Sequence, residues 1–199
     1  MKKNISKEHI VETALELMRN KNDLRGLNLR EVARTLGCAH TNLYNYFPSY
    51  SDLLWETHAS LLEMFIETLN DRLQASGSPE LKLNCFFRMF VNTYMDNRGW
   101  FRLAWHEHIG DERPRRDIEV TEKTNQELNM YISEIWKEIS GKYPEAEHVK
   151  RVLHNTHCYI IGEISNYLSG RGIIQNEAEF REYVTYEAID MFRLCLIGE

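Results

Sequence analysis

The chain has 199 residues, of which 43% are hydrophobic and 27% charged. This composition is typical of a globular protein with a sizeable core and argues against extended disorder. The formal charge of −6 at pH 7 would by itself argue against a nucleic-acid partner. However, residues 1–58 hold eight Lys or Arg against seven Asp or Glu, whereas residues 59–199 hold sixteen against twenty-three. The acidity belongs to the second part, so DNA binding by the first part is not excluded.

Several function classes are disfavoured by missing patterns. No apolar run approaches the roughly 18 residues of a membrane span, and the first residues lack the apolar core of a signal peptide, so we expect a cytoplasmic protein with no membrane partner. The sequence contains no GxSxG, HExxH or P-loop motif, and GRGIIQ lacks the third glycine of a dinucleotide fingerprint. We therefore expect neither catalysis nor a cofactor.

The periodicity predicts an all-α fold of about nine helices, because every apolar segment repeats at helical spacing and no hairpin signal is present. In the first helix, Ile10, Ala14, Leu17 and Met18 share one face. A linker signal stands at 75–79. The expected helices cover residues 6–20, 28–36, 40–47, 50–75, 80–97, 100–108, 117–140, 145–169 and 177–197.

The stretch from Asn28 to Leu54 contains three helix starts. Asn28 can cap a short helix with Glu31 closing a capping box, and Gly37 then ends that helix. Ser49 opens the long helix with a second box, because Asp52 can reach back to the Ser49 amide. Two short helices joined through a glycine turn are typical of a helix-turn-helix.

The second short helix carries side chains suited to reading DNA. A recognition helix needs hydrogen-bonding side chains near its N-terminus, where they approach base edges in the major groove. The candidates for base edges are His40, Thr41, Asn42 and Asn45, and the tyrosines Tyr44, Tyr46 and Tyr50 have hydroxyls that can reach phosphates. Either asparagine could pair with adenine N6 and N7.

The same segment resembles a known family. The order Val32-Ala33, Leu36-Gly37-Cys38, Leu43-Tyr44, Phe47-Pro48-Ser49 and Leu53-Leu54 is similar to the DNA-binding segment of TetR-family transcriptional regulators. The resemblance covers residues 5–58 and implies double-stranded operator DNA as a partner, with Asn28 and Arg30 at the other side of the groove. It also implies a homodimer that pairs through its last two helices, and a cavity for a small-molecule effector among the helices that follow the long one.

The chain departs from that family at four positions. Ala39, Thr41, Tyr46 and Tyr50 stand where the family usually has Ser, Gly, His and Lys. Ala39 cannot cap the recognition helix, which forgoes about 1 kcal/mol. Tyr50 removes the usual cationic phosphate contact, so we expect a modest dependence of DNA affinity on salt.

The second part is predicted to bind an apolar or aromatic effector. Aromatic and sulfur side chains on several helices could converge on a pocket with a few polar groups. The candidates are Met64, Phe86, Phe90, Tyr94, Trp100, Trp105, His106, Met130 and His157. Each of these residues could instead be ordinary core.

The last two helices are apolar on more than one side, which predicts a second packing partner. The residues expected at a homodimer interface are Val152, Tyr159, Ile160, Ile164, Phe180, Val184 and Phe192. Gly162 in mid-helix agrees with close approach of another helix. A monomer in which both helices are central is the alternative.

The sequence therefore predicts a ligand-responsive repressor, with residues 1–48 as the DNA-binding domain and residues 49–199 as the ligand-binding and dimerisation domain. Three other interpretations stay open. The pairs His106/His108 and His154/His157, the second with Cys158, could make a metal-responsive regulator, although ordinary histidines are the simpler explanation. The four scattered cysteines form no CxxC and read as reduced thiols, with Cys38 as an alternative redox sensor. A helical protein–protein adaptor with a degenerate helix-turn-helix is the other alternative.

Overall fold

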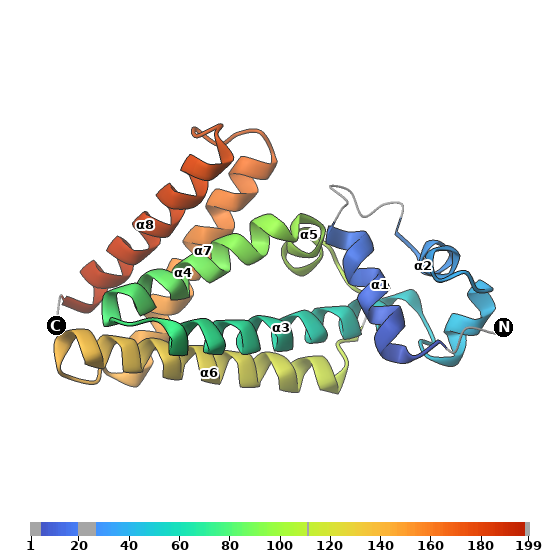
Figure 1. Ribbon diagram of the computed structural model, residues 1–199, viewed down its shortest axis with the longest axis horizontal. Coiled ribbons are helices and arrows are strands. Elements are labelled where there is room, and N and C mark those ends of the chain that lie inside the picture. Colours follow the sequence, from blue (N-terminus) through green and yellow to red (C-terminus); the bar gives the residue numbers. More distant parts are fainter. Residues whose placement is uncertain (1–4, 20–26, 111, 198–199) are drawn as a thin grey trace. The chain divides into compact units, whose positions relative to one another are not determined.

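The computed structural model describes residues 5–19, 27–110 and 112–197, and all regular structure within these ranges is helical. The predicted all-α fold is confirmed (Figure 1). The elements are α1 (Lys7–Arg19), α2 (Leu29–Leu36), the 3₁₀-helix η1 (His40–Asn45), α3 (Tyr50–Ala75), α4 (Pro79–Asp96), α5 (Arg98–His106), α6 (Arg115–Ser140), α7 (Ala146–Leu168) and α8 (Glu177–Ile197).

The chain packs as two compact units. The first unit comprises Met1–Met64 and Asp96–Glu122, and the second comprises Phe65–Met95 and Lys123–Glu199. Helices α3 and α6 each contribute residues to both units. These units describe packing, and the functional division at residue 48 stays a prediction.

Local capping explains the helices of the first unit. Asn28 Oδ1 accepts a hydrogen bond from the Glu31 amide at 3.1 Å, and Gly37 closes α2 in the left-handed conformation with φ of 72°. At the start of α3, the Ser49 amide donates to Asp52 Oδ2 at 2.9 Å while the Asp52 amide donates to Ser49 Oγ at 3.1 Å. This is the reciprocal box that the sequence predicts.

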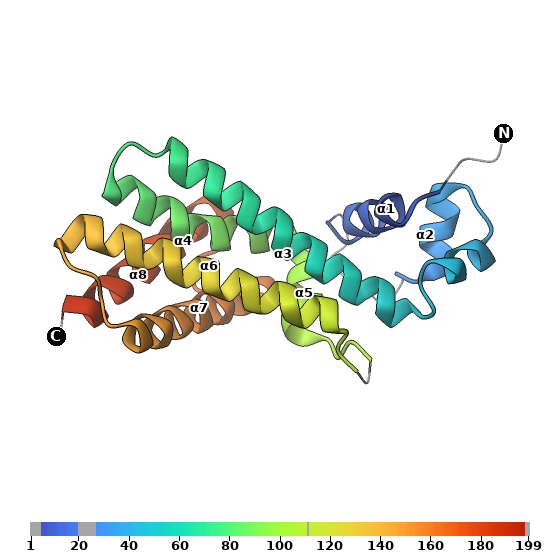
Figure 2. The ribbon, with the colours of Figure 1, turned by 90° about the horizontal axis from the view of Figure 1, so that it is seen from below.

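The core of the first unit is mostly aliphatic, with the ring of Phe47 among its buried side chains. Helices α1 and α2, η1 and the start of α3 form the group around it (Figure 2). Its innermost side chains include Ile10, Ala14, Val32, Leu43 and Leu53. Helix α5 also packs on α1, and Arg19 Nε donates to Asn97 Oδ1 at 3.1 Å.

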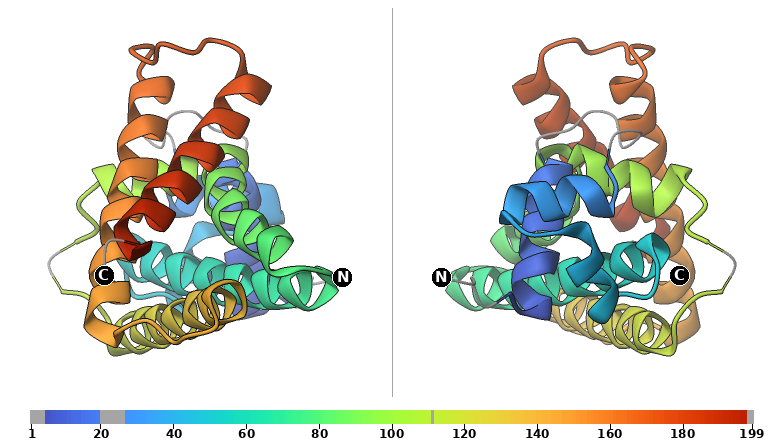
Figure 3. Two further views of the ribbon diagram at one scale, coloured as in Figure 1. Left: turned by 90° about the vertical axis from the view of Figure 1, so that its left-hand side faces the viewer. Right: turned by 90° about the vertical axis from the view of Figure 1, so that its right-hand side faces the viewer.

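The second unit has an aromatic core. Helices α7 and α8 pack side by side as a hairpin (Figure 3). Phe192 of α8 lies against Phe87 of α4 and Trp136 of α6, with ring centroids 5.4 and 6.0 Å away. At the surface, Lys82 pairs with Glu138 at 2.7 Å, which links α4 to α6.

Within the described residues, no helix is both long enough and apolar enough to cross a membrane.

Candidate functional site

The second helix of the helix-turn-helix divides its side chains between core and solvent. Leu43 is fully buried, whereas Thr41, Asn42 and Asn45 are exposed. The element is a 3₁₀-helix over His40–Asn45, shorter than the expected helix 40–47. Its first residue is preceded by Ala39, which makes no side-chain cap, and Pro48 follows it closely, so the sequence offers little to extend it.

The three tyrosines of this region have different surroundings. Tyr44 is 51% exposed and its ring meets His40 edge-on at 6.4 Å. The Tyr46 hydroxyl donates to the backbone carbonyl of Ile5. Tyr50 is half-buried, and its burial together with the charge of Glu31 raises the pKa of its hydroxyl above the ordinary value. Of the three, Tyr44 presents its ring to solvent most openly.

The beginning of α2 supplies the other predicted contacts. Asn28 and Arg30 are both exposed, on either side of the buried Leu29. The Asn28 side-chain oxygen accepts a hydrogen bond from the Glu31 amide, so Asn28 also caps the N-terminus of α2. At the start of α3, the Ser49 amide donates to Asp52 and so is already engaged.

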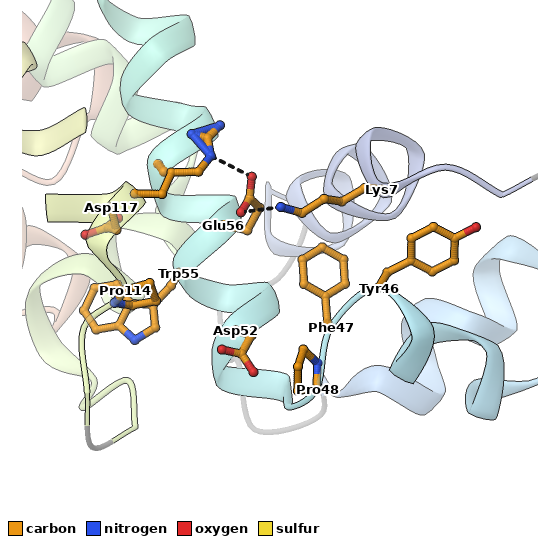
Figure 4. Close-up of a pocket in the computed structure, with 11 residues that line it drawn as sticks. Lys7, Tyr46, Phe47, Pro48, Asp52, Trp55, Glu56, Pro114 and Asp117 are labelled. Carbon is orange, nitrogen blue, oxygen red and sulfur yellow. Dashed lines mark hydrogen bonds and ion pairs between the residues drawn. The ribbon is translucent and has the colours of Figure 1, made fainter. Parts of the chain in front are cut away.

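A groove that the sequence did not predict lies in the first unit beside η1 (Figure 4). It has a volume of about 210 Å³ and is lined by residues of α1, the η1–α3 junction, α3 and α6. Lys7 Nζ and Arg116 Nε contact the two carboxylate oxygens of Glu56 at 2.8 and 3.0 Å. Glu56 is 49 residues from Lys7 and 60 from Arg116 in the sequence, so no local sequence pattern predicts these two ion pairs.

Asp117 lies at one wall of the groove and is almost fully buried, with 1% of its side chain exposed. It accepts hydrogen bonds from His58 Nδ1 and Arg113 Nε, both at 2.5 Å. Burial alone would raise the pKa of the Asp117 carboxyl, but the hydrogen bonds and charges of His58 and Arg113 outweigh it and hold the pKa below its ordinary value. The cluster links the middle of α3 to the start of α6.

Four of the predicted effector-binding residues come together in the second unit. The rings of Phe86 and His157 lie 5.5 and 5.0 Å from that of Phe90. Tyr94 stacks on His157 at 5.8 Å, and its hydroxyl hydrogen-bonds His157 Nε2. Burial, followed by the charge of His154, lowers the pKa of His157 to about 4, so the imidazole is neutral at physiological pH.

The other predicted effector-binding residues lie elsewhere. Met130 is on the exposed side of α6. Residues of the first unit include Met64, Trp100, Trp105 and His106, of which Trp100 is buried and the others are exposed. The structure therefore gathers a smaller set than the sequence suggested.

Most of the residues predicted for a dimer interface lie inside the second unit. Six of them lie buried within the second unit itself: Val152, Ile160, Ile164, Phe180, Val184 and Phe192. Tyr159 is half-buried. The wide apolar arcs of α7 and α8 are used to pack these helices on each other and on α4, so they do not by themselves require a partner. Among the side chains of α8 that the structure describes, the large apolar ones that are exposed are Tyr186 and Leu194.

The histidine and cysteine pairs do not assemble into a larger cluster. Within the described ranges, no group of three or more His, Cys, Asp or Glu is arranged to hold a metal ion. His106 and His108 are exposed, and His154 Nε2 lies 3.6 Å from Cys158 Sγ.

The chain is similar to known regulators in sequence and in fold. No family model matches it. It is 24% identical over 156 residues to an uncharacterised HTH-type transcriptional regulator of Haemophilus influenzae, covering 76% of this chain and 72% of that one.

Solved structures extend the likeness over nearly the whole chain. A TetR/AcrR-family regulator of Thermobifida fusca aligns with a TM-score of 0.63 and 18% identity, covering 92% of this chain and 96% of that one. The regulator FadR of Bacillus subtilis, solved in complex with stearoyl-CoA, aligns with a TM-score of 0.68 and 14% identity, covering 98% of this chain and 100% of that one. The resemblance predicted from the helix-turn-helix residues is thereby confirmed, and the chain has the fold of TetR/AcrR-family transcriptional regulators.

Proposed function

We propose that the chain is a transcriptional regulator of TetR type that binds operator DNA as a homodimer and is released by an apolar effector. The observation that carries the DNA-binding proposal is the division of η1, in which Leu43 anchors the element while Asn42 and Asn45 stay exposed. Short polar side chains in this position can approach base edges in the major groove.

A gel-shift assay with the DNA upstream of the chain's own coding region tests the proposal. Asn42→Ala and Asn45→Ala should each weaken binding by about 5- to 150-fold, since a bidentate pair with adenine is worth about 1–3 kcal/mol. Asn125→Ala is the matched control, because Asn125 is an exposed asparagine of α6 in the other unit. If both recognition-helix variants bind as well as the parent chain, the adaptor reading replaces this one.

The proposed effector site is the aromatic cluster around Phe90 in the second unit. The rings of Phe86, Tyr94 and His157 give it an apolar wall with one neutral polar pair. A neutral imidazole adds no buried charge, which favours an apolar ligand. The stearoyl-CoA bound by the FadR regulator of similar fold supports a long acyl chain as the effector class.

Thermal melts with a panel of acyl-CoA thioesters of different chain lengths test the effector. A ligand that binds only the folded chain raises the melting temperature. At a ligand concentration of 100 times the dissociation constant, it adds about 2.7 kcal/mol to the free energy of unfolding. Phe90→Trp should remove this shift, because a larger ring at the centre of the cluster would compete with a ligand for the same volume, whereas Leu81→Ala, at an exposed position of α4, should keep it. An unchanged melting temperature across the panel would contradict the acyl proposal.

Dimerisation is proposed through the exposed side chains of α7 and α8. Tyr186 and Leu194 are both 66% exposed on α8, beyond the hairpin's own core. In a two-fold dimer, the surface around these two side chains contacts the same surface of the second copy. The two recognition helices can then enter successive major grooves about 34 Å apart. Tyr186→Asp should shift the sedimenting species to the monomer, while Leu81→Asp should not.

The proposed release follows from linkage. Helix α3 is continuous from Tyr50 to Ala75 and contributes to both units. An effector that prefers an arrangement unsuited to operator DNA lowers DNA affinity, and DNA lowers effector affinity by the same factor. Measuring effector affinity with and without operator DNA therefore tests this step.

A further inference from the structure

The outer face of α7 carries a histidine and a cysteine one turn apart. Both His154 and Cys158 are exposed. The core-facing positions of this helix are Val149, Val152, Leu153, Thr156, Ile160 and Ile164. At 3.6 residues per turn, His154 and Cys158 fall on the opposite side of the helix from that set. Packing of the second unit therefore does not account for them.

The two donor atoms stand at the spacing of metal ligands. Cys158 Sγ lies 3.6 Å from His154 Nε2. A tetrahedral Zn²⁺ with a Zn–S distance of about 2.3 Å and a Zn–N distance of about 2.0–2.1 Å separates its sulfur and nitrogen ligands by about 3.5 Å. We propose that His154 and Cys158 form a two-residue clip for Zn²⁺ or a similar thiophilic divalent cation, and that a second copy of the chain supplies the same pair to complete the site.

The need for a second copy follows from the ligand count. Two residues supply half of a tetrahedral set, and the described part of the chain brings no third His, Cys, Asp or Glu to them. A two-fold axis that places two α7 helices together would supply His₂Cys₂ from two identical clips. This step rests on the homodimer proposed above.

The next turn of α7 is open to a neighbouring helix. Gly162 is exposed, and a Cβ added there would meet nothing within 4 Å. Glycine inside a helix costs about 1 kcal/mol relative to alanine. The absence of a side chain at Gly162 would let a second α7 helix approach closely beside Cys158, which would explain why glycine occupies this position.

The binding step is balanced by proton release. Each Cys158 Sγ–H gives its proton to solvent and coordinates as a thiolate, while His154 coordinates through the Nε2 lone pair with its proton on Nδ1. One cation therefore displaces two protons per dimer, and its affinity falls as the pH is lowered. His157 takes no part, because it is bonded to Tyr94 in the aromatic cluster.

The experiment is a titration of the untagged, chelator-treated full chain with Co²⁺ as the spectroscopic probe. We expect thiolate-to-cobalt charge-transfer absorption together with the intense d–d bands of tetrahedral Co²⁺, saturating at one cation per two chains and lost on addition of Zn²⁺. His154→Ala and Cys158→Ser should each abolish the charge-transfer band. Cys195→Ser, which removes another exposed thiol, should leave it unchanged.

Three results would overturn the proposal: no charge-transfer band, a band that survives either clip variant, or saturation at one cation per chain. If His154 and Cys158 only form a thiol–imidazole hydrogen bond and bind no metal, no charge-transfer band will appear. Sedimentation and gel shifts of the metal-free chain keep this failure separate from that of the proposed function. If the metal-free chain dimerises and binds operator DNA but shows no charge-transfer band when Co²⁺ is added, only the metal clip is refuted. If the chain neither dimerises nor binds DNA, the regulator proposal is refuted.

Discussion

Replacing Asp117 with asparagine perturbs a charge that is almost fully buried in the first unit. The change keeps the side-chain volume but removes the negative charge that His58 and Arg113 face. Asparagine must also offer an amide group where the carboxylate accepted two N–H donors. The variant therefore leaves at least one donor poorly paired in a buried setting, which is costly.

The magnitude follows from the exposure of the two partners. The His58 side chain is 14% exposed, so its charge-assisted hydrogen bond should contribute near the upper end of the usual range of about 1.5–3 kcal/mol. The Arg113 side chain is 39% exposed, and water screens its bond to below about 1 kcal/mol. Together they predict a loss of about 3 kcal/mol, which corresponds to a fall in melting temperature of about 6–12 °C.

The assay is thermal unfolding followed by circular dichroism at neutral pH. Glu119→Gln is the matched control, because Glu119 pairs with Arg115 on the same helix but both side chains are mostly exposed, so its loss should be under about 0.5 kcal/mol. Since the pKa of Asp117 is lowered in the folded chain, its stabilisation is complete above the ordinary carboxyl pKa and is lost as pH falls through the folded value. Equal melting temperatures for Asp117→Asn and Glu119→Gln would refute the reasoning.

Three further predictions concern other parts of the chain. Gly37→Ala should destabilise the chain by about 1 kcal/mol, because φ of 72° disfavours a side chain although nothing lies within 4 Å of the added Cβ; a denaturant titration that shows no loss would contradict this. Asp52→Ala should cost about 1 kcal/mol through loss of the capping box, measured in the same way. Because the pKa of His157 is lowered from 6.5 to about 4, the unfolded chain binds the proton first, so this group should reduce stability by about 3 kcal/mol as pH falls across that interval. NMR should then show a His157 imidazole that stays neutral at pH 5.

Local signals were sufficient to place the helices. The long helix from Tyr50 to Ala75 was predicted with the same ends, because Ser49 and Asp52 form its start and the 75–79 linker follows it. The turn at Gly37 was likewise readable, since a left-handed C-cap favours glycine. Caps act between residues that are neighbours in sequence, so a single sequence contains the whole interaction.

Contacts between residues that are far apart in the sequence were harder to predict, because no local pattern contains both partners. The ion pairs of Glu56 and the bond between His58 and Asp117 join residues that are 49 to 60 positions apart. Ile160 and Phe192 show the second limit, since a wide apolar arc predicts burial but does not say whether the same chain or a partner provides it. The structure assigns both residues to the core of the second unit.

The surroundings of the tyrosines sharpen the expected electrostatics of DNA binding. The Tyr46 hydroxyl already donates to the carbonyl of Ile5, and Tyr50 is half-buried near the charge of Glu31, so both are less open to a phosphate than Tyr44 is. Tyr44 is then the tyrosine best placed to contact the backbone, and a neutral hydroxyl releases no counterion. Tyr44→Phe should thus weaken operator binding equally at all salt concentrations, whereas Arg30→Gln should also flatten the salt dependence by about one unit of slope. A Tyr44→Phe variant that changes the slope as much as Arg30→Gln does would contradict this assignment.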